Sequence, residues 1–145
     1  MGNDVVIREA TRSDSAEIFQ LLRVFTASFT PSEDQFEKTL PILLDDPAAF
    51  LNVALINQRI IGYCLAFDHH TFYADGRVTW VEEITVAEEH RRKGIATALM
   101  KAAEDWAVQR DSRLVALATR RAEDFYKSIG YDKSAIYFRK LFRSQ

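Results

Sequence analysis

"ITVAEEHRRKGIATAL", residues 84–99, begins as an apolar strand and ends as an amphipathic helix. Three consecutive cations at 91–93 and then Gly94 stand where the strand passes into the helix. The first turn of a helix carries backbone N–H groups without intrahelical partners, and its aligned peptide dipoles add partial positive charge. Because Gly94 has no Cβ and Ala96 is small, an anion can come close to this backbone. The stretch therefore predicts a site for a pyrophosphate or a similar polyanion at the carboxyl end of a strand.

Two other phosphate-binding motifs do not fit this turn. A dinucleotide fingerprint needs three spaced glycines, and a triphosphate loop needs G-x-x-x-x-G-K followed by serine or threonine, whereas only Gly94 is present here. On these residues alone the alternative interpretation is a solvated basic turn at the start of the helix. Cations at a helix start oppose the helix dipole slightly, a cost that a bound anion would remove.

Length and composition set the class of protein. The chain has 145 residues, of which 48% are apolar and 28% charged, and this favours a single domain over residues 1–145 with a real core. Its net charge of −2 argues against general nucleic-acid binding. One cysteine, Cys64, allows no internal disulfide, and no run of about 18 apolar residues or signal-like start is present. We expect a cytoplasmic protein without a membrane partner.

The elements around the opening stretch follow from hydrophobic periodicity and turn residues. We expect helices from Asp14, from Thr30 and from about Gly94, and a short helix over 121–131, with Pro41 kinking or dividing the second. Residues 69–77 are expected to form a loop, and Asn57-Gln58 a tight turn. The expected strands are 4–9, 50–56, 59–67, 78–86, 113–118 and 134–142. The resulting order, β-α-α-β-β-β-α-β-α-β, predicts an α/β (α+β) fold.

Two motifs in this order resemble those of the GCN5-related N-acetyltransferase (GNAT) superfamily. The first is Arg/Gln-x-x-Gly-x-Gly/Ala between a strand and a helix, matched by Arg91, Gly94 and Ala96. The second is Ala-x-x-Phe-Tyr-x-x-x-Gly-Phe/Tyr, matched by "AEDFYKSIGY" at 122–131. The first strand and helix also resemble the family's usual start, so the resemblance covers nearly the whole chain. It implies a mixed central sheet flanked by helices, with a splayed strand pair at 78–86 and 113–118.

The resemblance also implies acetyl-coenzyme A as co-substrate, with no metal. Backbone groups of the strand end would pair with its pantetheine arm, and amides of the following turn would hold its pyrophosphate. Thr119 stands where many members carry a coenzyme-binding asparagine, and its hydroxyl reaches less far than an amide. The expected coenzyme-binding residues are Ile84, Thr85, Val86, Arg91, Arg92, Lys93, Gly94, Ile95, Ala96, Thr97, Thr119 and Phe125.

Acetyl transfer to an amine needs a base for the amine, polarisation of the thioester carbonyl and a proton for the departing thiolate. The resemblance places Tyr126 near the thioester sulfur as the acid. Glu82 and Glu83 are the candidate bases, because two acids within an apolar strand are costly to bury without purpose. Neighbouring strand residues face opposite sides, so one of them should reach the cleft unless a bulge reorients them. We favour Glu83 slightly, and a base that acts through water remains an alternative.

Three functions compete on this sequence. The first is an N-acetyltransferase that moves an acetyl group from acetyl-coenzyme A to a primary amine of a small molecule or peptide. The second is a non-catalytic coenzyme A-binding or sensor domain of the same fold. The third is nucleic-acid binding through the cations at 91–93 and 120–121, which the net acidity argues against. The sequence does not define the amine acceptor.

Smaller features add two expectations. The 68–77 region, with Asp68, Asp75 and two histidines, could line the mouth of the acceptor site; His69 and His70 alone are weak evidence for a metal. The 134–142 segment could pair with another chain as an edge strand, so a homodimer is possible.

Overall fold

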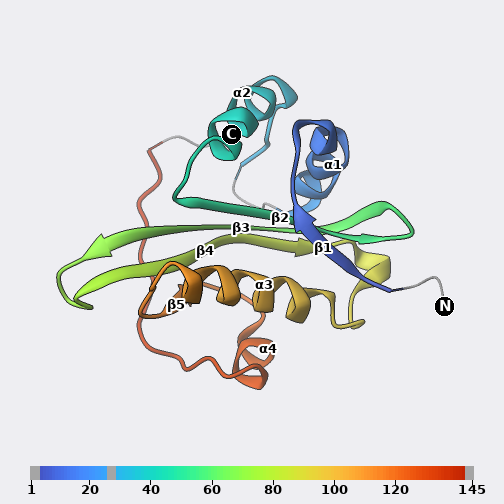
Figure 1. Ribbon diagram of the computed structural model, residues 1–145. Helices are drawn as coiled ribbons and strands as arrows, with labels where there is room; N and C mark the ends of the chain where they lie inside the picture. Colours follow the sequence, from blue (N-terminus) through green and yellow to red (C-terminus); the bar gives the residue numbers. More distant parts are fainter. Residues whose placement is uncertain (1–3, 26–28, 143–145) are drawn as a thin grey trace.

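The computed structural model describes residues 4–25 and 29–142, which form one five-stranded sheet between two layers of helices (Figure 1). The strands follow the order β1-β2-β3-β4-β5, antiparallel up to β4 and parallel between β4 and β5. They are β1 (Val6–Glu9), β2 (Ala49–Ile56), β3 (Arg59–Thr71), β4 (Gly76–Val86) and β5 (Val115–Leu117). The helices are α1 (Ser15–Phe25), α2 (Glu33–Leu44), α3 (Ile95–Gln109) and α4 (Glu123–Ser128), with 3₁₀ turns η1 (Arg12–Asp14) and η2 (Glu88–His90). The predicted fold class is confirmed.

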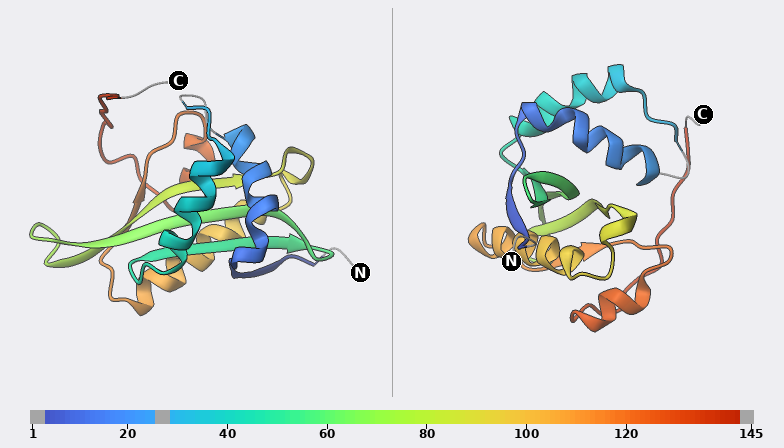
Figure 2. Two further views of the ribbon diagram at one scale, coloured as in Figure 1. Left: turned by 90° about the horizontal axis from the view of Figure 1, so that it is seen from above. Right: turned by 90° about the vertical axis from the view of Figure 1, so that its right-hand side faces the viewer.

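Helices α1 and α2 cover one face of the sheet, and α3 and α4 lie on the other (Figures 1 and 2). The core is accordingly split into two buried clusters. On the α3 side, Leu99 is 0% exposed and packs with residues such as Cys64 and Val81. On the α1/α2 side, Leu40 and Tyr63 belong to the second cluster. Full burial of a side chain such as Leu99 stabilises the fold by about 1.5–3 kcal/mol.

The first hairpin agrees with the sequence and the second is longer than expected. Asn57 and Gln58 have φ of 51° and 66°, as a two-residue type I′ turn requires. By contrast, the ladder between β3 and β4 continues to Thr71 and Gly76. The prediction of a loop over 69–77 is therefore wrong, because most of these residues are paired and only 72–75 form the tip.

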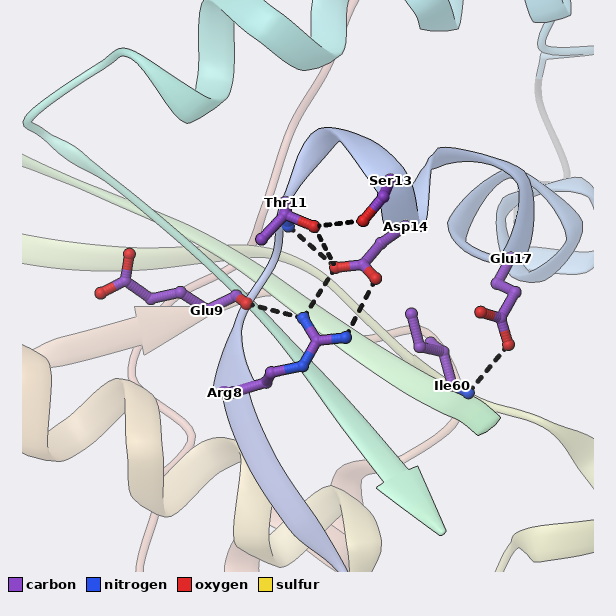
Figure 3. Close-up of polar contacts among 7 residues, drawn as sticks. All are labelled: Arg8, Glu9, Thr11, Ser13, Asp14, Glu17 and Ile60. Carbon is purple, nitrogen blue, oxygen red and sulfur yellow. Dashed lines mark hydrogen bonds and ion pairs between the residues drawn. The ribbon is translucent and has the colours of Figure 1, made fainter. Parts of the chain in front are cut away.

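The junction between β1 and α1 contains a turn that the sequence did not predict: α1 begins at Ser15, one residue after the expected start at Asp14, and η1 precedes it (Figure 3). Thr11, not Asp14, precedes the η1 turn, and its N–H donates to the Asp14 carboxylate at 2.8 Å. Two nitrogens of Arg8 donate to the same carboxylate at 2.8 and 3.0 Å. The hydrogen bond from Arg8 lowers the pKa of Asp14. Glu17, in the first turn of α1, accepts from the N–H of Ile60 at 3.0 Å and so attaches α1 to β3.

Helix α2 corrects two further expectations. Its N-cap is Ser32 rather than Thr30, since the Ser32 hydroxyl accepts from the N–H of Gln35 at 3.2 Å. Pro41 neither divides nor ends the helix, which continues to Leu44. The proline lies near the carboxyl end, where only a short length of helix follows it.

Strand β4 contains the irregularity on which the site depends. Its pairing with β3 shifts register, because Leu65 lies opposite Glu83 while Ala66 lies opposite Val81. Glu82 is therefore the extra residue of a β-bulge. Strand β5 pairs with β4 only from Thr79 to Val81, although β4 continues to Val86. The two strands separate beyond Val81, which confirms the splayed pair.

The carboxyl-terminal segment does not form the expected last strand. No strand is present in the described residues 132–142, so the prediction for 134–142 is wrong and the expected order is confirmed only through α4. The segment passes the edge of the sheet towards the α1/α2 layer (Figures 1 and 2). A strand needs a partner along its length, and β5 beside it has only three residues. Its exposed apolar residues are Ile136, Tyr137, Phe138, Leu141 and Phe142.

Candidate functional site

Two cavities meet β4 where it bulges and leaves β5. The acceptor-side cavity, about 230 Å³, lies between the sheet and the α1/α2 layer. Its lining residues are Ile18, Leu22, Pro31, Ser32, Gln35, Phe36, Thr39, Leu40, Leu43, Leu51, Tyr63, Leu65 and Glu83. The splay-side cavity, about 330 Å³, is lined by Val24, Phe25, Ile84, Thr85, Val86, Arg91, Ala96, Ala122, Phe125 and Tyr126. Glu83 lines the first cavity and Ile84 the second, so consecutive residues of one strand connect the two.

The strand edge in the splay-side cavity is open for hydrogen bonding. The N–H of Ala87 donates to Ile61 of β3 at 2.7 Å. Because successive residues of a strand direct their backbone groups to opposite edges, the N–H groups of Ile84 and Val86 point away from β3. On that side β5 has already separated from β4. An extended ligand can therefore pair with this edge as an added strand would.

The turn between β4 and α3 has the backbone that an anion site requires. Arg92 and Gly94 have φ of 65° and 80°, both in the left-handed region. Gly94 is the N-cap of α3, and the side chains of residues 91–93 are exposed around it. The Nε of Arg91 donates to the carbonyl of Val86 at 3.1 Å, so this arginine also fixes the turn against the strand end. Three cationic residues and the N–H groups at the start of a 15-residue helix thus lie together in this turn.

The expected coenzyme-binding residues divide into three groups. Ile84, Thr85, Val86, Arg91, Ala96 and Phe125 line the splay-side cavity together. Arg92, Lys93, Gly94, Ile95 and Thr97 lie in the adjoining turn and first helical turn without lining it, and the Ile95 side chain is buried in the core. Thr119 stands apart, because its hydroxyl accepts from the N–H of Ala122 at 3.0 Å and it lines neither cavity.

The bulge separates the two candidate bases. Glu82 is exposed on the bulge and lines neither cavity. Glu83 reaches into the acceptor-side cavity, where its carboxylate accepts from the hydroxyl of Tyr63 at 2.7 Å. Burial raises the pKa of Glu83 above its ordinary value, while the hydrogen bond from Tyr63 opposes that rise. Glu83 thus combines a position in the cavity with a pKa shifted towards the range in which a general base works.

Tyr126 lies on the other side of β4, in the splay-side cavity. Its ring packs edge-on against Phe125 and Tyr131, with ring centroids 4.9 and 5.9 Å away. Burial raises the pKa of Tyr126 to about 12, so its hydroxyl carries a proton at neutral pH. The residue can therefore donate a proton within this cavity.

Sequence reasoning missed several lining residues. Tyr63 is the most important, because it is the hydrogen-bond partner of Glu83. Its role follows from the β3–β4 register, which a bulge shifts and which no local motif encodes. Val24 and Phe25 bring the end of α1 to the splay-side cavity, and hydrophobic periodicity marks them only as helical positions.

The 68–77 region does not border the acceptor-side cavity. Asp68 is buried and forms ion pairs with Arg110 and Arg77, so the prediction that it adds charge to the acceptor mouth is wrong. His69 and His70 are exposed and pair with Val78 and Arg77 at the start of β4, whereas Val86 ends that strand. In residues 4–25 and 29–142, no three His, Cys, Asp or Glu side chains gather as a metal ion would need.

Comparisons with known proteins agree with this geometry. The model of the acetyltransferase (GNAT) family matches residues 15–131. The uncharacterized N-acetyltransferase YhfO of Bacillus subtilis (strain 168) is 26% identical over 133 residues, covering 88% of this chain and 89% of its own.

Two solved structures show the same fold at low identity. A transcriptional regulator from Bacillus halodurans C-125 has a TM-score of 0.87 at 21% identity and covers 96% of this chain and 100% of its own. The aminoglycoside N-acetyltransferase AAC(6')-Iy, solved in complex with CoA, has a TM-score of 0.84 at 19% identity, with 97% of both chains covered. These likenesses concern the fold alone. None of the helices in the described part of the chain has the length and apolar character needed to cross a membrane.

The Tyr63–Glu83 hydrogen bond can be tested directly. Tyr63→Phe removes a donor that stabilises the ionised carboxylate, so we expect the pKa of Glu83 to rise further. Carbon-13 NMR titration of glutamate-labelled protein measures this shift. Tyr131→Phe is the matched control, because Tyr131 donates to Glu104 at the same 2.7 Å but contacts the other face of the sheet. An unchanged Glu83 titration in Tyr63→Phe would contradict the assignment.

Proposed function

The chain belongs to the acetyltransferase (GNAT) family, and we propose that it is an N-acetyltransferase acting by direct transfer from acetyl-coenzyme A to a primary amine. The acceptor amine belongs to a small molecule or a peptide. One observation carries the proposal: Glu83 lines one cavity and Ile84 the other, at the bulge of β4. A base for the amine and an open strand edge for the coenzyme are thereby adjacent in the chain.

The residues around the splay-side cavity fit acetyl-coenzyme A. The open backbone edge at Ile84 and Val86 suits the amide groups of an extended pantetheine arm. Backbone N–H groups from Arg92 to Thr97 and the charges at 91–93 suit its pyrophosphate. Because Thr119 is engaged with Ala122, we leave it out of the proposed coenzyme site. The coenzyme supplies an acetyl group activated as a thioester.

Each catalytic task has a candidate in the chain. Glu83 takes a proton from the acceptor ammonium, directly or through one water, so that nitrogen can attack the acetyl carbon. A free N–H of Ile84 or Val86 stabilises the negative charge that develops on the carbonyl oxygen. Tyr126 donates its hydroxyl proton to the sulfur as the carbon–sulfur bond breaks. The new carbon–nitrogen bond replaces the thioester bond, and the second proton lost by the amine returns the tyrosine to its protonated state.

We also propose a cytoplasmic location and a homodimer. The single cysteine, Cys64, is a free buried thiol, which suits a reducing compartment. For the dimer, the support is the exposed apolar segment 134–142 beside β5, whose outer edge carries no further strand of the described sheet. Exposed edge strands are templates for pairing with another chain. The segment of a second copy would cover that edge.

Coenzyme binding tests the first half of the proposal. We expect calorimetry to detect acetyl-coenzyme A binding by the wild type, and Gly94→Asp to lose it through an added negative charge at the anion site. Gly76→Asp is the matched control, since both glycines have positive φ and open space around an added Cβ. Tyr126→Phe should retain affinity while its turnover falls. Equal binding by both aspartate variants would remove Gly94 from the site.

The role of Glu83 makes a prediction about rate and pH. We expect the rate of thiol release to fall roughly 10²–10⁴-fold in Glu83→Gln, because the general base is lost. Glu82 is exposed, so Glu82→Gln should keep a rate close to that of the wild type. Only ionised Glu83 accepts a proton, so the wild-type rate rises with pH through a pKa above the ordinary 4.5. In Glu83→Gln this rise of the rate with pH should be absent. A similar loss in both variants would disprove the separation of the two acids.

Sedimentation equilibrium tests the dimer. We expect the wild type to form dimers and Phe138→Asp to shift towards monomer, because Phe138 is 86% exposed in the segment that would be covered. Val108→Asp, at an exposed position of α3, is the control and should not change the association. A wild type that stays monomeric over the whole concentration series would exclude the dimer.

A further inference from the structure

We propose that the acceptor is a small monoamine with an apolar body, such as an alkylamine or arylalkylamine, rather than a polyamine or an amino sugar. This inference rests on the N-acetyltransferase function proposed above and concerns its acceptor-side cavity. The apolar lining, the single carboxylate and the small volume of that cavity support it. The solved neighbour that acts on aminoglycosides shares the fold alone with this chain.

The walls of the acceptor-side cavity are apolar. Eight of its 13 lining residues have apolar side chains, contributed by α1, α2, the segment before α2, and strands β2 and β3. Leu22, Phe36 and Leu43 illustrate the helical wall that faces the sheet. Burial of apolar ligand surface against such walls is favourable by about 25 cal/mol per Å². A hydroxyl-rich ligand would gain little here and would lose its water.

Most polar groups of the lining are already engaged. The Ser32 hydroxyl accepts from the N–H of Gln35, and the Thr39 hydroxyl donates to the Gln35 carbonyl at 2.9 Å. The hydroxyl of Tyr63 donates to Glu83. The free capacity is therefore limited to the Gln35 amide and to the second hydrogen-bonding sites of these hydroxyls, which is less than a sugar with many hydroxyls requires, and each unpaired polar group costs roughly 1–3 kcal/mol when buried.

Charge limits the acceptor to one ammonium group in the cavity. Glu83 is the single carboxylate among the described lining residues. A second ammonium placed along the same cavity would meet leucine side chains and neutral polar groups but no counter-ion, which is unfavourable. One end of the ligand is therefore cationic before reaction, and the remainder is apolar.

Volume limits the size of the apolar body. The cavity holds about 230 Å³. Cavities that hold drug-sized ligands measure about 300–1,000 Å³, so this one suits a smaller molecule. Hexylamine and 2-phenylethylamine are small enough for such a cavity, whereas aminoglycosides, which are built of several rings, are drug-sized. Spermidine is disfavoured by its additional charges rather than by its size.

The experiment compares kcat/KM for thiol release at saturating acetyl-coenzyme A. We expect kcat/KM to rise about threefold to fourfold for each methylene from propylamine to hexylamine, as the transfer of a buried CH₂ group predicts. Hexylamine should exceed 1,6-diaminohexane, spermidine, glucosamine and kanamycin at least tenfold. The diamine is the sharpest comparison, because it differs from hexylamine only by the distal amino group.

A charge variant tests the same point without disturbing the core. Gln35→Glu adds a carboxylate to the lining at an exposed helical position, and glutamate is favoured three residues after the Ser32 cap. We expect the preference for hexylamine over the diamine to fall at least fivefold. Lys38→Gln makes the same change in net charge on α2 outside the cavity, and it should leave the preference unchanged.

The outcomes separate this inference from the function on which it rests. A diamine, polyamine or aminoglycoside acetylated better than hexylamine would overturn the inference and leave the N-acetyltransferase in place. Acetyl-coenzyme A binding without acetylation of any amine would overturn the proposed function, and the acceptor inference with it. The proposed function and the acceptor inference would both be established by two results together. The first is a rise of kcat/KM with chain length, and the second is a preference that shifts towards the diamine in Gln35→Glu but not in Lys38→Gln.

Discussion

The bulge at Glu82 is the constraint on which the site depends. Side chains of a strand alternate between two faces, and one additional residue reverses that alternation from the bulge onwards. Because of it, Val81 and Ile84 both pack on the α3 side, while Glu83 faces the α1/α2 layer. The same strand leaves β5 at this level, so the backbone edge opens beside the inserted residue. A single irregularity thus turns a packed strand into a boundary between two cavities.

The carboxylates that are removed from solvent in this chain differ in the groups that they bind. Asp14 and Asp68 are buried against arginines, and the pKa of Asp14 is lowered by Arg8, so its contribution to stability is present at neutral pH and is lost on acidification through that lowered pKa. Glu83 has a tyrosine hydroxyl as its partner, and burial raises its pKa. A raised carboxyl pKa has the opposite effect on the pH dependence of stability. The neutral form stabilises the fold, and this contribution is lost as pH rises through the raised pKa. Ionised Glu83 therefore weakens the fold at neutral pH, which is a cost typical of a functional group.

Local signals in the sequence predicted most of the fold, and long-range pairing explains what they could not predict. Residues 84–99 and 122–131 carry their motifs in consecutive positions, so the turn at Gly94 and the helix with Tyr126 could be anticipated. Which of Glu82 and Glu83 faces the cavity depends on which residue of β4 is left unpaired by β3. The same β3–β4 register brings Tyr63 next to Glu83. The carboxyl-terminal segment has the composition of a strand, but composition does not supply the neighbouring strand that it needs.

In the proposed function, the two helical layers separate recognition of the acceptor from binding of the acetyl donor. The acceptor walls come mainly from α1 and α2, early in the chain, whereas the turn at Gly94 and the helix with Tyr126 come later and lie beyond the opposite face of the sheet (Figure 1). Mutations in the early helices can thus reshape one cavity with little effect on the backbone of the other. Substitutions at positions 18–22 and 31–43 can change the proposed acceptor while Val24, Phe25 and the rest of the proposed coenzyme site are kept, and gene duplication followed by such substitutions is the evolutionary route that this architecture opens.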